Sequence, residues 1–408
     1  MTDIRLKYLI QLNPKVSMTG FSEEDEVSFA PMECVKQGIM QPYTKTVGEL
    51  NSSYTCFEDG DLLIAKVTPC FENGNIAIAE KLSNGVGFGS SELFVIRALC
   101  NTKLLFYILQ SNQFKNAAMQ SMTGTAGLKR VSSDAIRNYR VKQFDDENAS
   151  LIVGFLDRKT RIIDSMISDK ERLIQLLEEQ RTSVICSAVT KGIDSTAKMK
   201  DSGVEWLGEI PAHWQILTNH QLFAERNIKC EKPDAVLLSV TKYLGVILQS
   251  QAEELNLATV APAETTEGYK VVCKGDLVMN IMRAKDGSYG ISNYDGVISP
   301  AYCIYYTRQQ ANPKYLYYLF KTPMYMEIFK NYSTGIAEHR MRLYPVNFFK
   351  IPAVVPPLEE QNEIVAYLDK RVKDIDELIS LTQQQIEKLK EYRQSVISEV
   401  VTGKVAVV

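Results

Sequence analysis

One amphipathic segment occurs twice in this chain of 408 residues, and the two copies lie 212 residues apart. Residues 152–193 and 364–405 align without a gap, and 17 of the 42 aligned positions are identical. Solenoids and propellers repeat every 20 to 50 residues or so, which is a far shorter period. The chain therefore consists of two large halves in tandem, and any function must use both halves.

Both copies of the segment are predicted to be long helices. Each follows a helix-start signal, "DDEN" at residues 145–148 or "PPLEEQ" at residues 356–361, because acids and proline suit the first turn. Each ends at a glycine that can adopt the left-handed conformation, Gly192 or Gly403. Twelve matched apolar residues recur about every 3.5 residues, the period of a coiled coil. These helix-pairing candidates are Leu156, Ile163, Ile167, Ile174, Leu177 and Val184, with Leu368, Ile375, Ile379, Ile386, Leu389 and Val396.

Two packing arrangements are open to these helices. Each could pack only on its own domain, or the two could pair with each other. Charged runs such as "DKRVKD" flank the narrow apolar seam, which favours a solvated helix beside a helix partner. We therefore expect an antiparallel coiled coil with pseudo-two-fold symmetry.

The regions between the helices read as mixed α/β and carry the same marks in the same order. Both contain Gly-Asp-Leu before an apolar run, "EDGDLLIAKV" at 58–67 and "CKGDLVMNIM" at 273–282. Both later contain a Thr-Gly turn followed by basic residues, "TGTAGLKR" at 123–130 and "TGIAEHRMR" at 334–342. The predicted fold is α+β, with domains at 1–145 and 194–355 and helices at 146–193 and 356–408.

Composition limits the class of protein. The chain is 45% hydrophobic and 23% charged, typical of a globular protein, and no apolar run approaches a membrane span. The start "MTDIRLKYLI" does not resemble a signal peptide, so we expect a cytoplasmic protein. Eight scattered cysteines without a CxxC pair, and only three histidines, favour reduced core thiols over disulfides or zinc. The net charge of −3 gives no overall basic footprint.

A family resemblance is carried by four stretches. The ending "IPAVVPPLEEQNEIVAYLDKRVKDIDELI", the segment "KDSGVEWLGEIPAHW" at 200–214 and the helix endings "SAVTKG" and "SEVVTGK" resemble the specificity subunit of type I restriction-modification systems. The resemblance implies two target-recognition domains, each reading one half of a bipartite site in double-stranded DNA. It also implies helices that set the spacing and dock two methyltransferase subunits, with restriction subunits in the full complex.

One departure from the family pattern concerns the first domain. The Trp-Leu-Gly-Glu-Ile-Pro segment occurs only before the second domain, which leaves open how the edge of the first is completed. The C-terminal end of the chain is one candidate. Trp206 and Trp214 are expected to anchor this linker segment onto the second domain rather than to contact DNA.

The sequence lacks the motifs of the enzymes that act beside DNA-recognition proteins. An adenine methyltransferase needs Asn/Asp-Pro-Pro-aromatic, but Asn13-Pro14 and Asn312-Pro313 are both followed by lysine. There is no G-x-x-x-x-G-K-[ST] phosphate loop. The charges of Asp157-Arg158-Lys159 are expected to face solvent from a helix. We therefore expect a non-catalytic chain that needs no cofactor.

Candidate DNA contacts follow the Thr-Gly turns, because arginine and lysine bind phosphates and arginine reads guanine. They are Lys129 and Arg130 in the first domain and His339, Arg340 and Arg342 in the second, with Arg283 and Lys285 as weaker candidates. Each could instead be an ordinary solvated charge. A coiled-coil scaffold with two protein-binding domains is the alternative function, although it has no need of paired Thr-Gly-basic turns. A free-standing hydrolase would need a nucleophile and base that the sequence does not offer.

Overall fold

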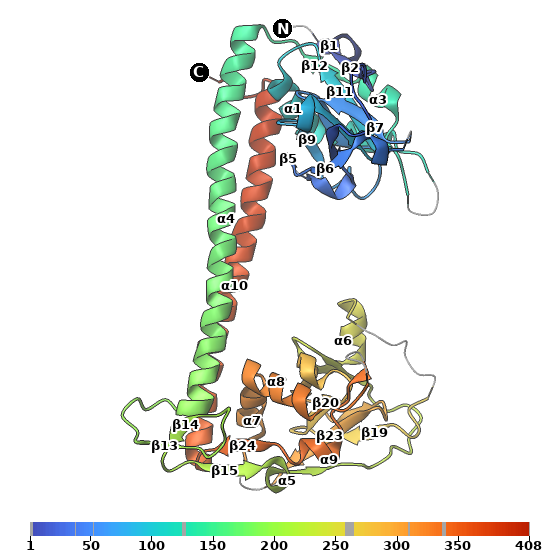
Figure 1. The fold of residues 1–408 in the computed structure, drawn as a ribbon. Coiled ribbons are helices and arrows are strands. Elements are labelled where there is room, and N and C mark those ends of the chain that lie inside the picture. The colour runs from blue at the N-terminus through green and yellow to red at the C-terminus, as the bar shows by residue number, and fades with distance from the viewer. Residues whose placement is uncertain are drawn as a thin grey trace. The chain divides into compact units, whose positions relative to one another are not determined.

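The computed structural model describes residues 3–36, 38–51, 53–124, 128–257, 265–308, 311–336 and 340–407. It divides into two compact units, the first made of Met1–Arg172 with Thr382–Val408 and the second of Leu173–Leu381. Each unit contains one globular part and one end of each long helix, α4 (Asp146–Lys191) and α10 (Leu358–Val401) (Figure 1). In the described part of the chain, no helix is long and apolar enough to cross a membrane.

The long helices begin and end at the residues that marked them in the sequence. The Asp145 carboxylate accepts a hydrogen bond of 2.8 Å from the backbone N–H of Asn148, which satisfies one of the unpaired donors at the start of α4. Gly192 (φ 78°) and Gly403 (φ 65°) adopt the left-handed conformation just after the helices. The predicted pair of long helices and the mixed fold class are confirmed.

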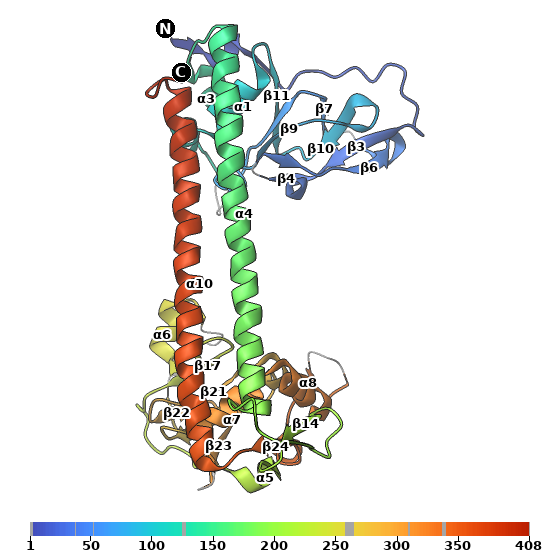
Figure 2. The same ribbon diagram turned by 90° about the vertical axis from the view of Figure 1, so that its left-hand side faces the viewer.

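Within each unit, opposite ends of the two helices lie side by side (Figures 1 and 2). In the first unit, Arg393 Nε of α10 donates to Asp164 Oδ1 of α4 at 2.8 Å. In the second, Arg181 Nε approaches Asp376 Oδ1 at 3.3 Å. The two ion pairs are copies of each other displaced by the repeat length, with the helices exchanged. The helices therefore run antiparallel in both units, and the contact in one unit repeats that in the other with the two helices exchanged.

The twelve residues assigned to the helix seam all lie on protected faces. Six are buried and six are half-buried; the buried ones are Leu156, Ile163, Leu177, Leu368, Ile375 and Ile386, and the half-buried ones Ile167, Ile174, Val184, Ile379, Leu389 and Val396. The helix ends also enter the domain cores: Leu156 packs in the first core with Ile397 of α10, and Leu368 packs in the second with Val189 of α4. Pairing with the other helix and packing on a domain thus occur together.

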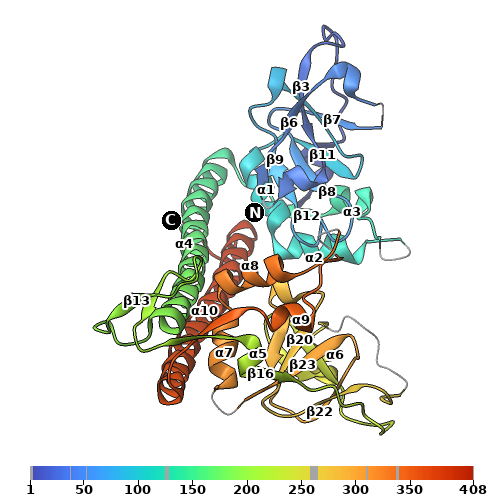
Figure 3. The ribbon, with the colours of Figure 1, turned by 60° about the horizontal axis from the view of Figure 1, so that its bottom comes forward.

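The first globular part contains two four-stranded sheets that lie next to one another (Figure 3). One has the order β6 (Tyr43–Thr46), β3 (Glu26–Ala30), β10 (Val86–Gly89), β7 (Thr55–Glu58), and the other β2 (Ile10–Leu12), β11 (Leu93–Ala98), β8 (Leu62–Ala65), β9 (Ile76–Ile78). Two short pairs complete it, β1 (Asp3–Arg5) with β12 (Arg140–Lys142) and β4 (Val35–Lys36) with β5 (Ile39–Met40). Its helices are α1 (Thr102–Gln110), α2 (Asn112–Gln120) and α3 (Ser133–Asn138).

The second globular part repeats the second of these sheets. Its four-stranded sheet has the order β16 (Phe223–Glu225), β23 (Tyr302–Thr307), β20 (Leu277–Asn280), β21 (Tyr289–Ile291). Four strand pairs surround it: β13 (Met199–Asp201) with β14 (Glu209–Pro211), β15 (Gln215–Thr218) with β24 (Pro352–Val355), β17 (Leu238–Thr241) with β18 (Gly245–Leu248), and β19 (Lys270–Val272) with β22 (Gly296–Ile298). The helices are α5 (Asn219–Leu222), α6 (Gln249–Glu254), α7 (Pro313–Phe320), α8 (Pro323–Tyr332) and α9 (Pro345–Phe348).

The repeated Gly-Asp-Leu motif places a buried carboxylate at the start of a central strand. Asp61 (1% exposed) accepts two hydrogen bonds of 2.8 Å from Arg97, and Asp276 (2% exposed) accepts bonds of 2.7 and 3.1 Å from Arg226. Arg97 belongs to β11, but Arg226 follows β16, the neighbouring strand of the equivalent sheet. The halves have therefore kept the buried acid and moved its arginine partner. Both pairs are bidentate, the strong geometry for arginine and carboxylate.

A second repeated feature is a pair of hydrogen bonds that joins each globular part to a long helix. In the first unit, Asp157 of α4 accepts from Lys103 Nζ at 2.9 Å and from the Tyr107 hydroxyl at 2.7 Å. Burial opposes ionisation of Asp157, but these two hydrogen bonds together with the charges of Lys103 and Arg161 outweigh it and lower the pKa of the carboxyl. The prediction that the three charges face solvent is therefore wrong for Asp157, which α1 partly covers, whereas Arg158 and Lys159 are exposed.

The second unit repeats this pair of hydrogen bonds in the same places. Asp369 of α10 accepts from Lys314 Nζ at 2.6 Å and from the Tyr318 hydroxyl at 2.7 Å. Asp157 and Asp369 are related by the 212-residue repeat, so the duplication preserved the attachment of domain to helix as well as the helix itself.

The tryptophan-containing linker packs on the second unit, as predicted. Trp214 is fully buried in the second core, where its Nε1 donates to Glu360 of α10 at 3.0 Å. Trp206 packs edge-on against Tyr325, with ring centroids 5.2 Å apart. In the first unit, Val407 near the C-terminal end packs against the core.

The eight cysteines are free thiols. Only Cys303 is buried, whereas Cys100 is exposed and the other six are half-buried. The prediction of core thiols therefore holds for Cys303 and is wrong for the others, which reach solvent at least in part; Cys186, for example, lies in the long helix α4.

Candidate nucleic-acid interface

The two Thr-Gly turns form equivalent loops closed by short antiparallel bridges. Thr123 and Arg130 exchange two backbone hydrogen bonds of 3.1 and 2.9 Å, and Thr334 and Arg342 exchange two of 3.0 Å. The arginine that ends each loop thus has its main chain fixed. Its side chain is exposed in both units.

Glycine is required after each threonine because the returning strand passes too close for a side chain. A Cβ on Gly124 would lie 2.2 Å from the carbonyl oxygen of Leu128, and one on Gly335 would lie 2.6 Å from that of Arg340. Gly124 also has a φ of 151°. Both distances are shorter than any tolerable contact, so the Thr-Gly motif closes the loop tightly.

In the second unit, this loop meets two others. The backbone N–H of Leu343, next to Arg342, donates to the carbonyl of Ile281 at 2.9 Å, which joins it to the loop after β20. Lys321 at the end of α7 joins that loop to the β17–β18 turn. Its Nζ donates to the carbonyl oxygens of Gly287 at 2.6 Å and Lys242 at 2.9 Å. Three loops distant in sequence therefore form one surface.

This surface is basic and carries exposed apolar side chains. The described residues of the three loops, 241–245, 281–288, 334–336 and 340–342, include five basic side chains and one acid, Asp286. The basic side chains are Lys242, Arg283, Lys285, Arg340 and Arg342, and of these only Lys285 is half-buried. Tyr243 is 82% exposed and Ile336 fully exposed. Cations bind phosphates, and protruding aromatic or aliphatic groups pack on bases or thymine methyls.

Lys321 itself is half-buried, and its ammonium group lies close to two tyrosine rings. Its Nζ is 4.8 Å from the ring centroid of Tyr289 and 5.4 Å from that of Tyr317. Burial lowers the pKa of this lysine to about 8. Two carbonyl oxygens and two ring faces are suitable partners for an ammonium group, so Lys321 is a cross-link between loops rather than a surface contact.

In the first unit, the loop that ends at Arg130 meets the segment after β8. Lys129 is exposed, while its backbone N–H donates to Thr68 Oγ1 at 3.0 Å and its carbonyl accepts from the Thr68 N–H at 3.0 Å. Arg130 donates from Nε and Nη2 to the two carboxylate oxygens of Glu92, at 2.9 and 2.7 Å. The ion pair lowers the pKa of Glu92 and raises that of Arg130. Arg130 is therefore held in one orientation.

The candidate residues from the sequence thus fall into two groups. Arg283, Lys285, Arg340 and Arg342 are brought together on the second unit, and Lys129 and Arg130 lie side by side on the first. His339 lies outside the described residues.

Sequence reasoning missed Lys242, Tyr243 and Glu92. The first two lie at the tip of a hairpin whose alternating strands, "LLSVTKYLGVIL", could have revealed a turn. No local pattern could have linked Glu92 to Arg130, because they are 38 residues apart.

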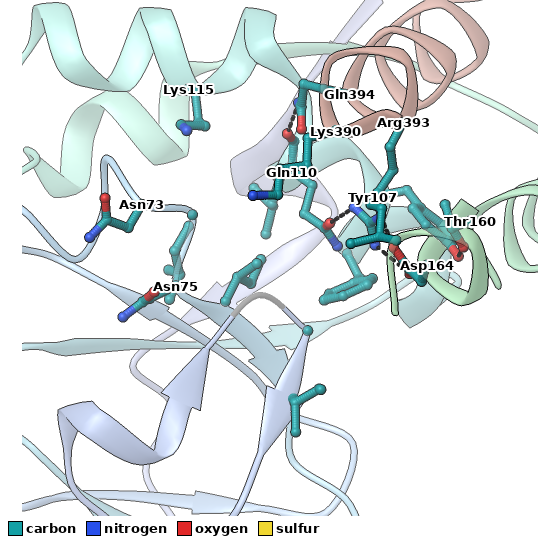
Figure 4. Close-up of a pocket in the computed structure, with 18 of the residues that line it drawn as sticks. Asn73, Asn75, Tyr107, Gln110, Lys115, Thr160, Asp164, Lys390, Arg393 and Gln394 are labelled. Atoms are coloured by element: carbon teal, nitrogen blue, oxygen red, sulfur yellow. Dashed lines mark hydrogen bonds and ion pairs between the residues drawn. The ribbon is translucent and has the colours of Figure 1, made fainter. Parts of the chain in front are cut away.

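A groove of about 750 Å³ in the first unit lies between α1 and the two long helices (Figure 4). Arg393 spans it, donating to Asp164 and, from Nη1 at 3.3 Å, to Gln110 Oε1. Tyr107 and Thr160 line the same wall. These polar groups join the two long helices to α1. Within the described ranges, no cluster of His, Cys, Asp and Glu side chains could hold a metal ion.

Comparison with known proteins points to one family. Residues 242–391 match the model of the type I restriction modification DNA specificity domain. The specificity subunit of the type I restriction enzyme EcoEI from Escherichia coli is 36% identical over 169 residues, which cover 40% of this chain. The matched stretch spans only 28% of the length of that subunit.

The whole fold is shared with solved structures. One solved structure concerns complex assembly and conformational transition of the type I R-M system. A chain of that structure superposes on this one with a TM-score of 0.72, and the match covers 99% of this chain and 98% of that chain. The HsdS subunit from Thermoanaerobacter tengcongensis gives a TM-score of 0.55, with 99% and 97% covered. Identity is 16% in both cases, so these likenesses concern the fold alone. In sequence over part of its length and in fold over nearly all of it, this chain resembles the specificity subunits of type I restriction-modification systems.

Proposed function

We propose that this chain is the DNA-recognition subunit of a type I restriction-modification complex. Residues 1–145 and 194–355 would each read one half of a bipartite site in double-stranded DNA. The helical segments 146–193 and 356–408 would set the spacing between the halves and dock methyltransferase subunits. The chain itself would be non-catalytic, with methylation and cleavage performed by its partners.

The observation that carries this proposal is the pair of bridge-closed loops, each ending in an arginine at the same structural position. A scaffold for proteins has no need of two such loops. The loops occupy the same place in a duplicated frame, yet the side chains around them differ, with Glu92 beside Arg130 and no acid at the matching position of the second unit. Two readers of different base sequences would differ in this way.

The low net charge of the chain also fits an arrangement in which partner subunits supply part of the contacts to DNA phosphates. Nonspecific affinity grows with the number of phosphates neutralised, and the net charge of −3 gives this chain little general attraction for DNA. In this proposal the methyltransferase subunits supply most phosphate contacts, and the basic loops supply those near the bases.

The test is a base-resolution map of DNA methylation in the source strain, with and without the gene for this chain. We expect modification of an interrupted site that disappears on deletion and returns on complementation. An unchanged methylation map would refute the proposal.

The number of partners is tested by measuring the mass of the reconstituted complex. We expect two methyltransferase subunits per chain, because the docking helix is duplicated. A stable one-to-one complex at saturating methyltransferase would contradict this part of the proposal.

A further inference from the structure

The ion pair between Arg130 and Glu92 is fixed at both ends. The main chain of Arg130 is held by its bridge to Thr123. That of Glu92 is held because its carbonyl accepts from the Lys66 N–H at 2.8 Å and its N–H donates to Ser90 Oγ at 3.2 Å. The side chains remain 50% and 33% exposed. The guanidinium group is therefore both oriented and accessible.

The geometry of the pair leaves one edge of the guanidinium unused. Glu92 accepts from Nε and Nη2, which are two of the three nitrogens. An arginine side chain has five N–H groups, so both hydrogens of Nη1 and the second hydrogen of Nη2 do not bond to Glu92, and no acceptor for them lies among the residues that the structure describes. The Nη1/Nη2 edge can donate two parallel hydrogen bonds, which is the pattern that O6 and N7 of guanine accept in the major groove.

The fold does not need this pair. Strands β8 and β11 pair in the same register as β20 and β23 of the second unit, which places Ala301 at the position of Glu92. The equivalent loop bridges place Arg342 at the position of Arg130. The second unit thus closes the same loop without the acid. Exposed ion pairs contribute little to stability, so stability gives no strong reason for Glu92.

A carboxylate beside a DNA-binding loop also has a cost. Glu92 repels phosphates and cancels the charge of Arg130, which weakens nonspecific binding. We propose that Arg130 reads a guanine in one half-site and that Glu92 is a positioning residue that holds its Nη1/Nη2 edge toward the base. This inference rests on the proposed function and adds the identity of a base and a residue that orients its reader.

The test uses the full chain assembled with its methyltransferase subunits and a duplex carrying the mapped site. Each guanine of both half-sites is replaced in turn by 7-deazaguanine, which removes N7 but keeps base pairing. In the wild type we expect a several-fold loss of affinity at one guanine from the missing hydrogen bond. Arg130→Ala should lower affinity for the natural site about 10- to 100-fold and abolish the sensitivity at that guanine.

Glu92→Ala is the decisive variant. It should reduce the 7-deazaguanine effect at the guanine that Arg130 reads while leaving every other position unchanged, and Glu92→Gln, which keeps one acceptor, should lie between it and the wild type. Lys129→Ala is the matched control in the same loop, because it removes a charge without touching the pair. It should weaken binding uniformly and preserve the sensitivity profile.

Three results would overturn the inference. Uniformly stronger binding by Glu92→Ala with an unchanged profile would mean that Glu92 only neutralises Arg130. A wild type that binds its site but tolerates 7-deazaguanine everywhere would mean that no guanine is read through N7, while the proposed function would stand. A wild-type complex without any site preference would refute the proposed function and this inference together.

Discussion

Replacement of Asp276 by alanine should selectively destabilise the second unit. Asp276 is 2% exposed and accepts hydrogen bonds from Arg226 and, at 2.8 Å, from the backbone N–H of Cys273. Its removal leaves Arg226, whose side chain is 22% exposed, without its carboxylate. Breaking a buried pair from one side costs about 3 to 5 kcal/mol, and the partial exposure of Arg226 favours the lower end of that range.

The positions of the tryptophans make this measurable. Both tryptophans of the chain, Trp206 and Trp214, pack on the second core, so their fluorescence reports the unfolding of the second unit. With a urea m-value of about 2 kcal/mol per molar, a loss of about 3 kcal/mol lowers the midpoint by roughly 1.5 M. Asp276→Asn keeps one acceptor oxygen and should cost less.

The matched control is Asp61→Ala, which breaks the equivalent pair in the first unit. It should lower the stability of that unit while leaving the tryptophan midpoint nearly unchanged. A shift below about 0.5 kcal/mol for Asp276→Ala would show that the bidentate pair contributes little, since surface changes alone produce shifts of that size. An equal tryptophan shift for both variants would mean that the two units unfold as one.

Three further perturbations address the basic loops, the long helices and the buried lysine. The double variant Arg340→Ala with Arg342→Ala should weaken binding of one half-site, by about 1 to 3 kcal/mol for each base that the arginines read. Competition binding with duplexes mutated in one half at a time would measure the loss for each half-site. Equal losses from both halves would indicate phosphate contacts only. Insertion of four residues after Gln180, about one helical turn, should lengthen the nonspecific gap of the methylated site by one or two base pairs. Circular dichroism must show that the helix is intact. Modification of the original spacing alone would mean that the helices do not set the distance between the half-sites. Burial lowers the pKa of Lys321 to about 8, so above that pH the unfolded chain binds more protons than the folded chain. The unfolding free energy of the wild type should therefore rise relative to that of Lys321→Met between about pH 8 and 10, by at most about 1.4 kcal/mol per pH unit. A pH-independent difference between the two unfolding free energies would contradict this.

The sequence by itself determined the features that depend on local patterns. Apolar spacing, start signals and the glycines at 192 and 403 located both long helices, because helix formation and termination depend on residues a few positions apart. The repeat located the duplicated frame. The Thr-Gly motif located the loops, because only glycine tolerates the close approach of the returning strand.

Only the tertiary structure decided which side chains meet. Asp157 read as a solvated helix charge, yet it is half-buried against α1 and accepts hydrogen bonds from Lys103 and Tyr107, some 50 residues earlier in the chain. The buried acids Asp61 and Asp276 kept their places in the motif while their arginines came from different strands, a change that no local pattern records. The basic surface of the second unit likewise depends on Lys321 drawing together turns that lie 34 and 79 residues away. The physical reason is that periodicity fixes which face of an element is buried, whereas hydrogen bonds and ion pairs form between whichever side chains the folded chain brings within about 3 Å.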